Sequence, residues 1–312
     1  MSVLVALGLF LVGAALAVWA TERLLEGLVR LATALRLSAF AVGAVLSGFE
    51  AENIAVGLAA GGNKAAALAL GTVFGGAIFL VCVALGLGAL LFPLDVQLPR
   101  SFLLVFAASP VVAGLALLGP VTPRWSGAIL LMAFGCAIVY LIRASRDRQF
   151  LRSHEVDEAQ EEQHSLGAAI ALTVAGIAVV SVGGELVAQG ASRIVDTLHV
   201  PALLMGMVVT PAIIELEEVI RQAVPAKEGR PDVSAGNLVG TLLYFVLFNL
   251  GLIALLTPVR VDPLVREFDW PFLIAVTWLA TLFLWRGRVG RGAGVILLAA
   301  YGTYILAHVL VR

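Results

Sequence analysis

Charged residues are scarce in this chain. Only 13% of its 312 residues are Asp, Glu, Lys or Arg, whereas 61% are hydrophobic. A soluble globular domain has about 45–50% apolar residues, so this composition excludes an ordinary soluble domain and indicates an integral membrane protein. The formal net charge is −1, and we therefore expect no basic surface that would bind nucleic acid.

Cysteine is rare, and the common catalytic motifs are missing. The two cysteines, Cys82 and Cys136, lie in separate apolar segments, which argues against a disulfide framework or a thiolate metal site. The sequence contains no His-Glu-x-x-His metal motif and no Gly-x-Ser-x-Gly nucleophile motif. We therefore expect neither enzymatic activity nor a bound cofactor.

Long apolar runs are abundant. A helix needs about 20 apolar residues to cross the hydrocarbon of a bilayer. Runs of this kind lie at 2–20, 38–60, 66–92, 102–119, 126–143, 166–189, 200–224, 234–257, 270–286 and 291–311. They predict an all-α integral membrane protein with ten transmembrane helices, five in each half of the chain.

A single strongly polar stretch separates the two groups of runs. We predict a first five-helix repeat at 1–143, a polar cytoplasmic linker at 144–165 and a second five-helix repeat at 166–312. Most of the 20 Lys and Arg residues, Arg221 among them, fall on the cytoplasmic side if both termini lie outside. An odd number of spans in each half makes the two repeats inverted relative to each other. The expected location is the plasma membrane, crossed many times.

The two halves repeat similar motifs in the same order. The first half contains Glu26-Gly27-x-x-Arg30, Gly43, Gly48-Phe49-Glu50-Ala51-Glu52-Asn53 and Gly71-Thr72-x-x-Gly75. The second half contains Gln189-Gly190-x-x-Arg193, Gly206, Glu215-Leu216-Glu217-Glu218 and Gly236-Asn237-x-x-Gly240. A duplicated set of motifs is typical of a transporter core built from repeats.

Several carboxylates fall inside predicted membrane helices. Ionisable groups at that depth are costly, so a functional site is the default interpretation. Three residues of a helix advance by about 300°, which places Glu215 and Glu218 on one face and Glu217 almost opposite. Pro211 disturbs the helix just before them, and we expect it to free backbone carbonyls that could bind a cation.

In the first half, Glu50 and Asn53 share one helical face, and Glu52 points away from it. The correspondence between the halves is open at this point. Gly43 and Gly206 set an offset of 163, which pairs Glu52 with Glu215. Gly71 and Gly236 set an offset of 165, which pairs Glu50 with Glu215 and Asn53 with Glu218. We prefer the first pairing because it puts the length change in a loop.

Two further acids and the glycine-rich segments have simpler explanations. Glu22 and Glu26 follow the first apolar run, where a helix end in the headgroup region accounts for them. The glycines around Thr72 and Asn237 would allow close helix packing. Their matching positions in the two halves equally favour a role in lining a site.

At these residues the sequence resembles the calcium/cation antiporter superfamily, which includes sodium/calcium and calcium/proton exchangers. The family segment E-G-x-x-R-L-A is matched by Glu26-Gly27-x-x-Arg30-Leu31-Ala32. Its G-N-x-x-G-S segment is approximated by Gly71-Thr72-x-x-Gly75-Gly76 and Gly236-Asn237-x-x-Gly240-Thr241. In the family's acidic motif, G-T-S-L-P-E or G-N-A-x-E, Glu218 and Glu52 stand at the Glu, and Glu215 replaces the Ser or Asn. This chain thus has more carboxylates and fewer neutral oxygens.

The resemblance implies a secondary active cation antiporter that works by alternating access. The expected metal-site residues are Glu50, Glu52, Asn53, Thr72, Glu215, Glu217, Glu218 and Asn237. Carboxylate oxygens suit a cation such as Ca²⁺, and H⁺ or Na⁺ would be the coupling ion. An internal repeat completes a site within one chain, so we expect a functional monomer in the lipid bilayer. The alternatives are a cation channel and a non-transporting membrane protein.

Overall fold

The computed structural model describes residues 3–34, 49–62, 65–144 and 166–310. The sequence features at Gly43 and Gly48 lie outside these ranges, as does almost all of the predicted linker at 144–165.

Eight helical segments in the described part of the chain are long and apolar enough to cross a membrane. They are α1 (Val3–Ala34), α4–η1–α5 (Ala66–Phe79, Leu80–Ala84, Leu85–Leu91), α6–η2 (Arg100–Ala113, Gly114–Leu117), α7 (Arg124–Ala144), α9 (Leu166–Leu198), α13–η4–α14 (Pro231–Leu243, Tyr244–Asn249, Leu250–Leu256), η5–α15 (Val265–Asp269, Trp270–Trp285) and α16 (Arg291–Leu310). They match eight of the predicted runs, and the chain is an all-α membrane protein that crosses the bilayer many times.

The other two predicted runs, 38–60 and 200–224, are not continuous helices. In the first, Phe49 and Glu50 are non-helical and α3 (Ala51–Gly62) starts directly after them. The second run is divided into α10 (Ala202–Leu204), η3 (Met205–Val209), α11 (Thr210–Ile214) and α12 (Leu216–Lys227). Backbone ends at membrane depth are tolerated only where protein or a cavity surrounds them.

The break in the second run lies at Glu215, four residues after the proline that was expected to cause it. The backbone of Glu215 has φ −85° and ψ 9°, which stops the regular helix. Pro211 lies in the first turn of α11. In a regular helix the residue at position 211 would donate to the Met207 carbonyl, but proline has no N–H. This carbonyl faces Gly75 of α4, since a Cβ on Gly75 would lie 2.4 Å from its oxygen. The Met207 carbonyl therefore packs against another helix.

The α4–η1–α5 and α13–η4–α14 spans form the centre of the molecule, since each is far more buried than the other membrane-length spans. Glycine allows close approach to the first of them. A Cβ on Gly71 would lie 2.0 Å from the carbonyl oxygen of Gly206 in η3, and one on Gly206 would lie 2.2 Å from that of Ala67. The Gly71 segment therefore serves close helix packing.

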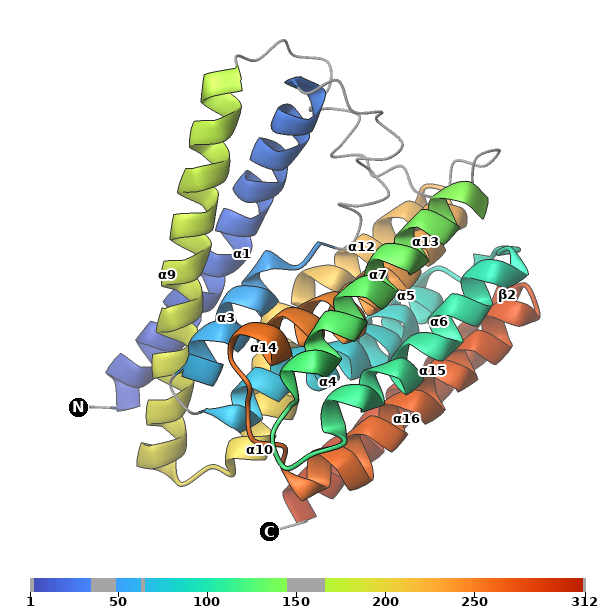
Figure 1. Ribbon diagram of the computed structural model, residues 1–312. Helices are drawn as coiled ribbons and strands as arrows, with labels where there is room; N and C mark the ends of the chain where they lie inside the picture. Colours follow the sequence, from blue (N-terminus) through green and yellow to red (C-terminus); the bar gives the residue numbers. More distant parts are fainter. Residues whose placement is uncertain (1–2, 35–48, 63–64, 145–165, 311–312) are drawn as a thin grey trace.

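Helices α1 and α9 form a long antiparallel pair beside the other helices (Figure 1). Small residues recur on their shared face every seventh position, at Gly13, Ala20 and Gly27 on α1 and at Gly176, Gly183 and Gly190 on α9. A Cβ on Gly183 would lie 2.7 Å from the Ala17 backbone nitrogen. The two backbones thus touch directly, which is a common way for membrane helices to associate.

The remaining helices cover the centre, and short β contacts join some of their loops. Strand β1 (Leu94–Asp95) pairs antiparallel with β2 (Arg288–Val289). At another loop, the Val121–Arg260 bridge joins the segments before α7 and after α14. These contacts link the first half of the chain to the second.

The glycine contact between α1 and α9 gives a stability prediction. Gly183→Ala places a methyl group against the Ala17 backbone and should destabilise the protein by about 1–3 kcal/mol, the usual cost of overpacking. Gly8→Ala is the matched control, because no atom lies within 4 Å of its added Cβ, and alanine favours helix by up to about 1 kcal/mol. Thermal unfolding in detergent should give a lower melting temperature for Gly183→Ala than for the wild-type protein, and an unchanged or higher melting temperature for Gly8→Ala. Equal melting temperatures for the two variants would contradict the direct backbone contact.

Candidate functional site

The carboxylates of the two broken runs meet at the starts of two helices. Glu50 directly precedes α3, and Glu52 and Asn53 lie in its first turn. Glu215 directly precedes α12, and Glu217 and Glu218 lie in its first turn. A helix start carries partial positive charge and free backbone N–H groups, so it is a favourable place for a carboxylate. The helix breaks therefore help to place negative charge inside the membrane region.

Most of this carboxylate cluster is fully enclosed. Glu50 and Glu218 have no exposed surface, and Glu52, Asn53 and Glu215 are each 1% exposed. Buried charge is costly unless another group compensates it. The site must therefore contain positive charge or hydrogen-bond donors, or bind a cation.

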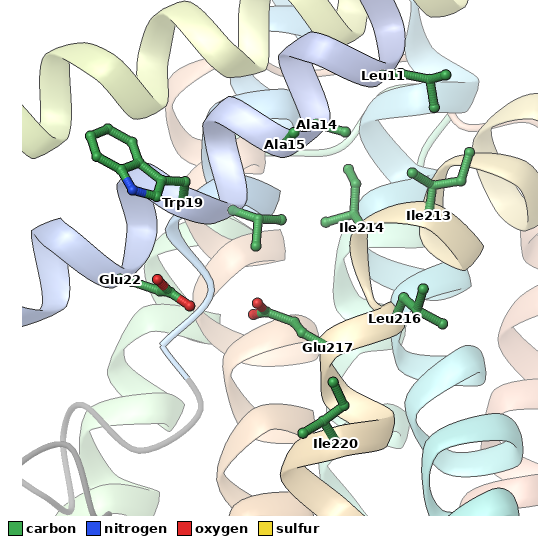
Figure 2. Close-up of a pocket in the computed structure, with 11 residues that line it drawn as sticks. Leu11, Ala14, Ala15, Trp19, Glu22, Ile213, Ile214, Leu216, Glu217 and Ile220 are labelled. Atoms are coloured by element: carbon green, nitrogen blue, oxygen red, sulfur yellow. The ribbon is translucent and has the colours of Figure 1, made fainter.

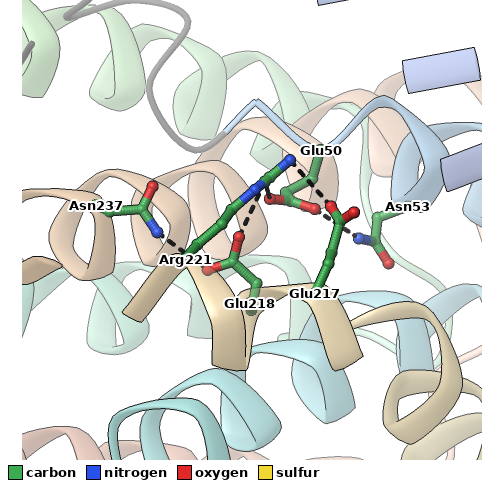
Figure 3. A network of polar contacts seen from close by, with 6 residues as sticks. All are labelled: Glu50, Asn53, Glu217, Glu218, Arg221 and Asn237. Carbon is green, nitrogen blue, oxygen red and sulfur yellow. Dashed lines mark hydrogen bonds and ion pairs between the residues drawn. The ribbon is translucent and has the colours of Figure 1, made fainter. Parts of the chain in front are cut away.

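Arg221, one turn into α12, supplies positive charge to three of the acids (Figure 3). Its Nη1 lies 3.1 Å from Glu50 Oε1 and 3.0 Å from Glu218 Oε1, and its Nη2 lies 3.0 Å from Glu217 Oε1. One guanidinium thus joins an acid of the first half to two acids of the second.

Two amides complete the hydrogen bonds of the fully buried acids. The Asn53 amide donates to Glu50 Oε2 at 3.4 Å, and the Asn237 amide donates from α13 to Glu218 Oε2 at 3.1 Å. Both oxygens of Glu50 and of Glu218 are therefore engaged.

Glu215 and Glu52 differ from these acids. Neither oxygen of Glu215 has a partner at hydrogen-bond distance among the residues that the structure describes, and the same holds for Oε2 of Glu52. The Asn53 amide is the side-chain donor that interacts with Glu215, from beyond that distance. Glu52 and Glu218 are electrostatic neighbours of Glu215. In addition, one oxygen each of Glu50, Glu52 and Glu217 lie within 4.8 Å of one another, close enough to share a metal ion. The cluster thus offers open carboxylate oxygens in an enclosed place.

The structure brings seven of the eight residues expected at the site into this cluster, namely Glu50, Glu52, Asn53, Glu215, Glu217, Glu218 and Asn237. Thr72 is buried in α4, and its hydroxyl donates to the Ala69 carbonyl. It also lies against α3, where a Cβ on Gly57 would be 3.1 Å from the Thr72 hydroxyl oxygen.

Two geometric expectations from the sequence are wrong. Glu217 does not point away from the other acids: it joins the Arg221 network, with 20% of its side chain exposed. The break at Glu215 removes the regular helical rotation on which that expectation depended. In addition, Glu50 and Glu215 each directly precede a helix start, which corresponds to the offset of 165 and not to the preferred 163.

Sequence reasoning missed Arg221 as a site residue and took it for a cytoplasmic charge. Its spacing of three and four residues from Glu218 and Glu217 was the available signal, because such pairs face each other on a helix. Its contact with Glu50 could not be read from the sequence, since the two residues are far apart in the chain.

A cavity of about 510 Å³ lies between α1 and the α11–α12 segment (Figure 2). Its lining is apolar apart from two acids and consists of Leu11, Ala14, Ala15, Val18, Trp19, Glu22, Ile213, Ile214, Leu216, Glu217 and Ile220. Glu22 lines this cavity together with Glu217. Glu26 instead pairs with Arg23 and Arg30 on α1.

Broken helices with buried carboxylates beside the breaks define a class of polytopic membrane proteins that handle ions. The sequence profile of the family described as "Sodium/calcium exchanger protein" matches residues 5–143 and 168–310. The chain belongs to this family.

Curated relatives match over almost their full length. The chain is 28% identical over 309 residues to the inner membrane protein YrbG of Escherichia coli, covering 96% of this chain and 95% of that protein. It is 26% identical over 314 residues to the putative antiporter CaxA of Alkalimonas amylolytica, covering 96% and 98%.

Solved structures of the sodium-calcium exchanger NCX_Mj share the fold. One of them, soaked with 2.5 mM Na⁺ and 10 mM Sr²⁺, aligns with a TM-score of 0.62 at 20% identity and covers 100% of both chains. Another, soaked with 10 mM Na⁺ and no Ca²⁺, aligns with a TM-score of 0.59 at 22% identity over the same coverage. At this identity the likeness concerns the fold alone.

The amide bond to Glu218 gives a second prediction. Asn237→Leu removes the donor to a carboxylate oxygen with no exposed surface and should cost about 1–3 kcal/mol of stability. Asn249→Leu is the control: this asparagine is fully buried on the same span, and neither amide atom has a partner among the described residues. Its replacement should be neutral or stabilising. Thermal unfolding in detergent compares them, and an equal cost at both sites would contradict the assigned hydrogen bond.

Proposed function

We propose that this protein is a secondary active cation antiporter that binds its cation at the carboxylate cluster and exchanges it by alternating access. Glu215 is the observation that carries the proposal. Its carboxylate is buried beside Glu52 and Glu218, and no donor of the described residues lies at hydrogen-bond distance from either oxygen, although the Asn53 amide is near. A carboxylate in such surroundings is explained by a cation that binds there and leaves again.

The chemistry of the ligands favours a hard cation. Glu52, Glu215, Glu218 and Glu50 supply only oxygen, which Ca²⁺ prefers, and the family name points the same way. We propose Ca²⁺ or a similar cation as substrate and H⁺ or Na⁺ as the coupling ion. A proton can couple because it binds the same carboxylate oxygens.

The cavity beside α1 reaches one acid of this site. Its apolar walls lead to Glu217, which also contacts Arg221. Glu22 adds a second negative charge to the cavity lining (Figure 2). Acids along a cavity with low-dielectric walls concentrate cations there, so we propose that cations reach the cluster past Glu22 and Glu217.

We further propose the architecture that this function needs. The eight membrane-length helices and the two broken runs make ten spans, in inverted repeats at 1–143 and 166–312 joined by a cytoplasmic linker. The separate matches of the family profile to residues 5–143 and 168–310 support this division. Both termini would then lie outside the plasma membrane, and a monomer would contain the whole site.

Transport into proteoliposomes tests the proposal. Purified protein should accumulate a labelled cation against an imposed pH or Na⁺ gradient, with Ca²⁺, Mn²⁺, Mg²⁺, Na⁺ and K⁺ compared as substrates. A fixed exchange ratio that does not change with voltage would separate an antiporter from a channel. If liposomes with and without the protein showed the same flux for every cation, the proposed transport would be contradicted.

The acids should differ in importance. Glu215→Gln or Glu218→Gln removes a fully enclosed charge and should slow exchange by about a hundredfold or more. Glu217→Gln should cost less than about tenfold, because this side chain is partly exposed. Glu228→Gln, an exposed acid just after the same helix, is the control. Initial rates at matched amounts of folded protein provide the measurement, and equal losses at 215, 217 and 228 would refute the assignment.

Cation binding should weaken as the pH falls. The cation binds ionised carboxylates and a proton binds the same oxygens, so added protons compete with it. The apparent affinity should fall by up to about tenfold per pH unit for each competing proton. Calorimetry in buffers of different ionisation enthalpy measures both the affinity and the protons released. A flat affinity with no proton release would exclude proton competition and favour Na⁺ coupling.

A further inference from the structure

Arg221 places a permanent positive charge among the acids proposed to bind the cation. Its Nη1 contacts Glu50 and Glu218, and its Nη2 contacts Glu217. Arginine stays protonated in proteins. Any cation that uses these oxygens must therefore compete with a charge that is attached to the protein itself.

The guanidinium divides the acids into two groups. Glu50, Glu217 and Glu218 are ion-paired with Arg221, whereas Glu215 and one oxygen of Glu52 have no partner among the described residues. A cation that first meets Glu52 and Glu215 would gain further ligands only when the guanidinium gives up Glu50 or Glu218.

Arg221 can move toward the more exposed side of the cluster. Its side chain is 23% exposed and Glu217 is 20% exposed, whereas Glu50 and Glu218 are completely buried. Glu217 lines the cavity beside α1, which Glu22 lines as well. Figure 3 shows the contacts of Arg221 with these three acids. A small movement of Arg221 toward the cavity would keep the Glu217 ion pair and release the two buried acids.

We propose that Arg221 is a tethered competitor of the transported cation: it occupies Glu50 and Glu218, and the cation displaces it toward Glu217 and the cavity. This inference rests on the proposed antiport function. It makes Arg221 a positioning residue that sets how many carboxylates are open to a cation, and hence the affinity. A purely structural arginine would only tie the two halves of the site together.

Calcium binding to the full-length protein, measured by calorimetry in detergent at constant pH, tests the proposal. Arg221→Gln removes the competitor and should tighten Ca²⁺ binding by about tenfold or more, the scale of a close charge contact in a buried site. Arg221→Lys keeps the charge and should stay near the wild-type affinity. Lys227→Gln removes the same charge from an exposed position on the same helix and should change nothing.

A second variant keeps the test decisive if Arg221→Gln fails to fold. Glu217→Gln removes the outer partner, leaves the guanidinium on the buried acids and should weaken Ca²⁺ binding by about threefold, the scale of a partly exposed ion pair. If both variants fold, adding Glu217→Gln to the Arg221→Gln variant should not change the Ca²⁺ affinity any further.

The outcomes separate the two proposals. Weaker or unchanged binding in Arg221→Gln, with wild-type binding intact, overturns the competitor role and leaves a structural tie. Tighter or unchanged binding in Glu217→Gln also overturns it. If the wild-type protein binds and transports no cation of the panel, the proposed function fails instead.

Discussion

The enclosure of negative charge at membrane depth is the constraint on which the rest of this structure depends. Glu50 and Glu218 have no exposed surface, and they are tolerated because Arg221, Asn53 and Asn237 supply donors to them. The two helix starts supply further positive potential. Breaking two runs that would otherwise cross the membrane as continuous helices makes those starts available. The fold thus lacks some regular helical hydrogen bonds at the two breaks, and the breaks create a place that can hold buried charge.

The glycine contacts serve this same purpose at a distance. A broken helix cannot hold itself in place, so its fragments need close neighbours. Gly71 and Gly206 let α4 touch η3, and Gly75 leaves room for the Met207 carbonyl and the Pro211 ring. On the opposite side, Gly184 lets α9 approach α3 next to Ala55. Small residues thus fix both broken runs against continuous helices, and these contacts set the spacing between the acids of the two halves.

Composition and helical periodicity were enough to predict the membrane class, eight of the spans and the acids that meet in the buried cluster, because apolar runs and the carboxylates within them are visible residue by residue. The rest depended on tertiary structure. The prediction for Glu217 assumed one regular helix from Glu215 to Glu218. The helix is broken at Glu215, and Glu217 therefore joins the cluster. Arg221 was assigned to the cytoplasmic side because the sequence does not show that it contacts Glu50, a residue from the other half of the chain. The contact of the Met207 carbonyl with Gly75 could not be predicted either, because the two residues lie in different helices far apart in the chain.

The lining of the cavity beside α1 gives the molecule a natural optical reporter. Trp19 is the one tryptophan of five in the chain that lines this cavity, where it shares the wall with Glu22 and Glu217 (Figure 2). The Arg23 guanidinium lies 5.9 Å from its ring centroid. Indole emission shifts with the local electric field and with water contact. Movement of charge or water past Glu217 would therefore be visible in the intrinsic fluorescence of a protein that keeps only Trp19, without any added label.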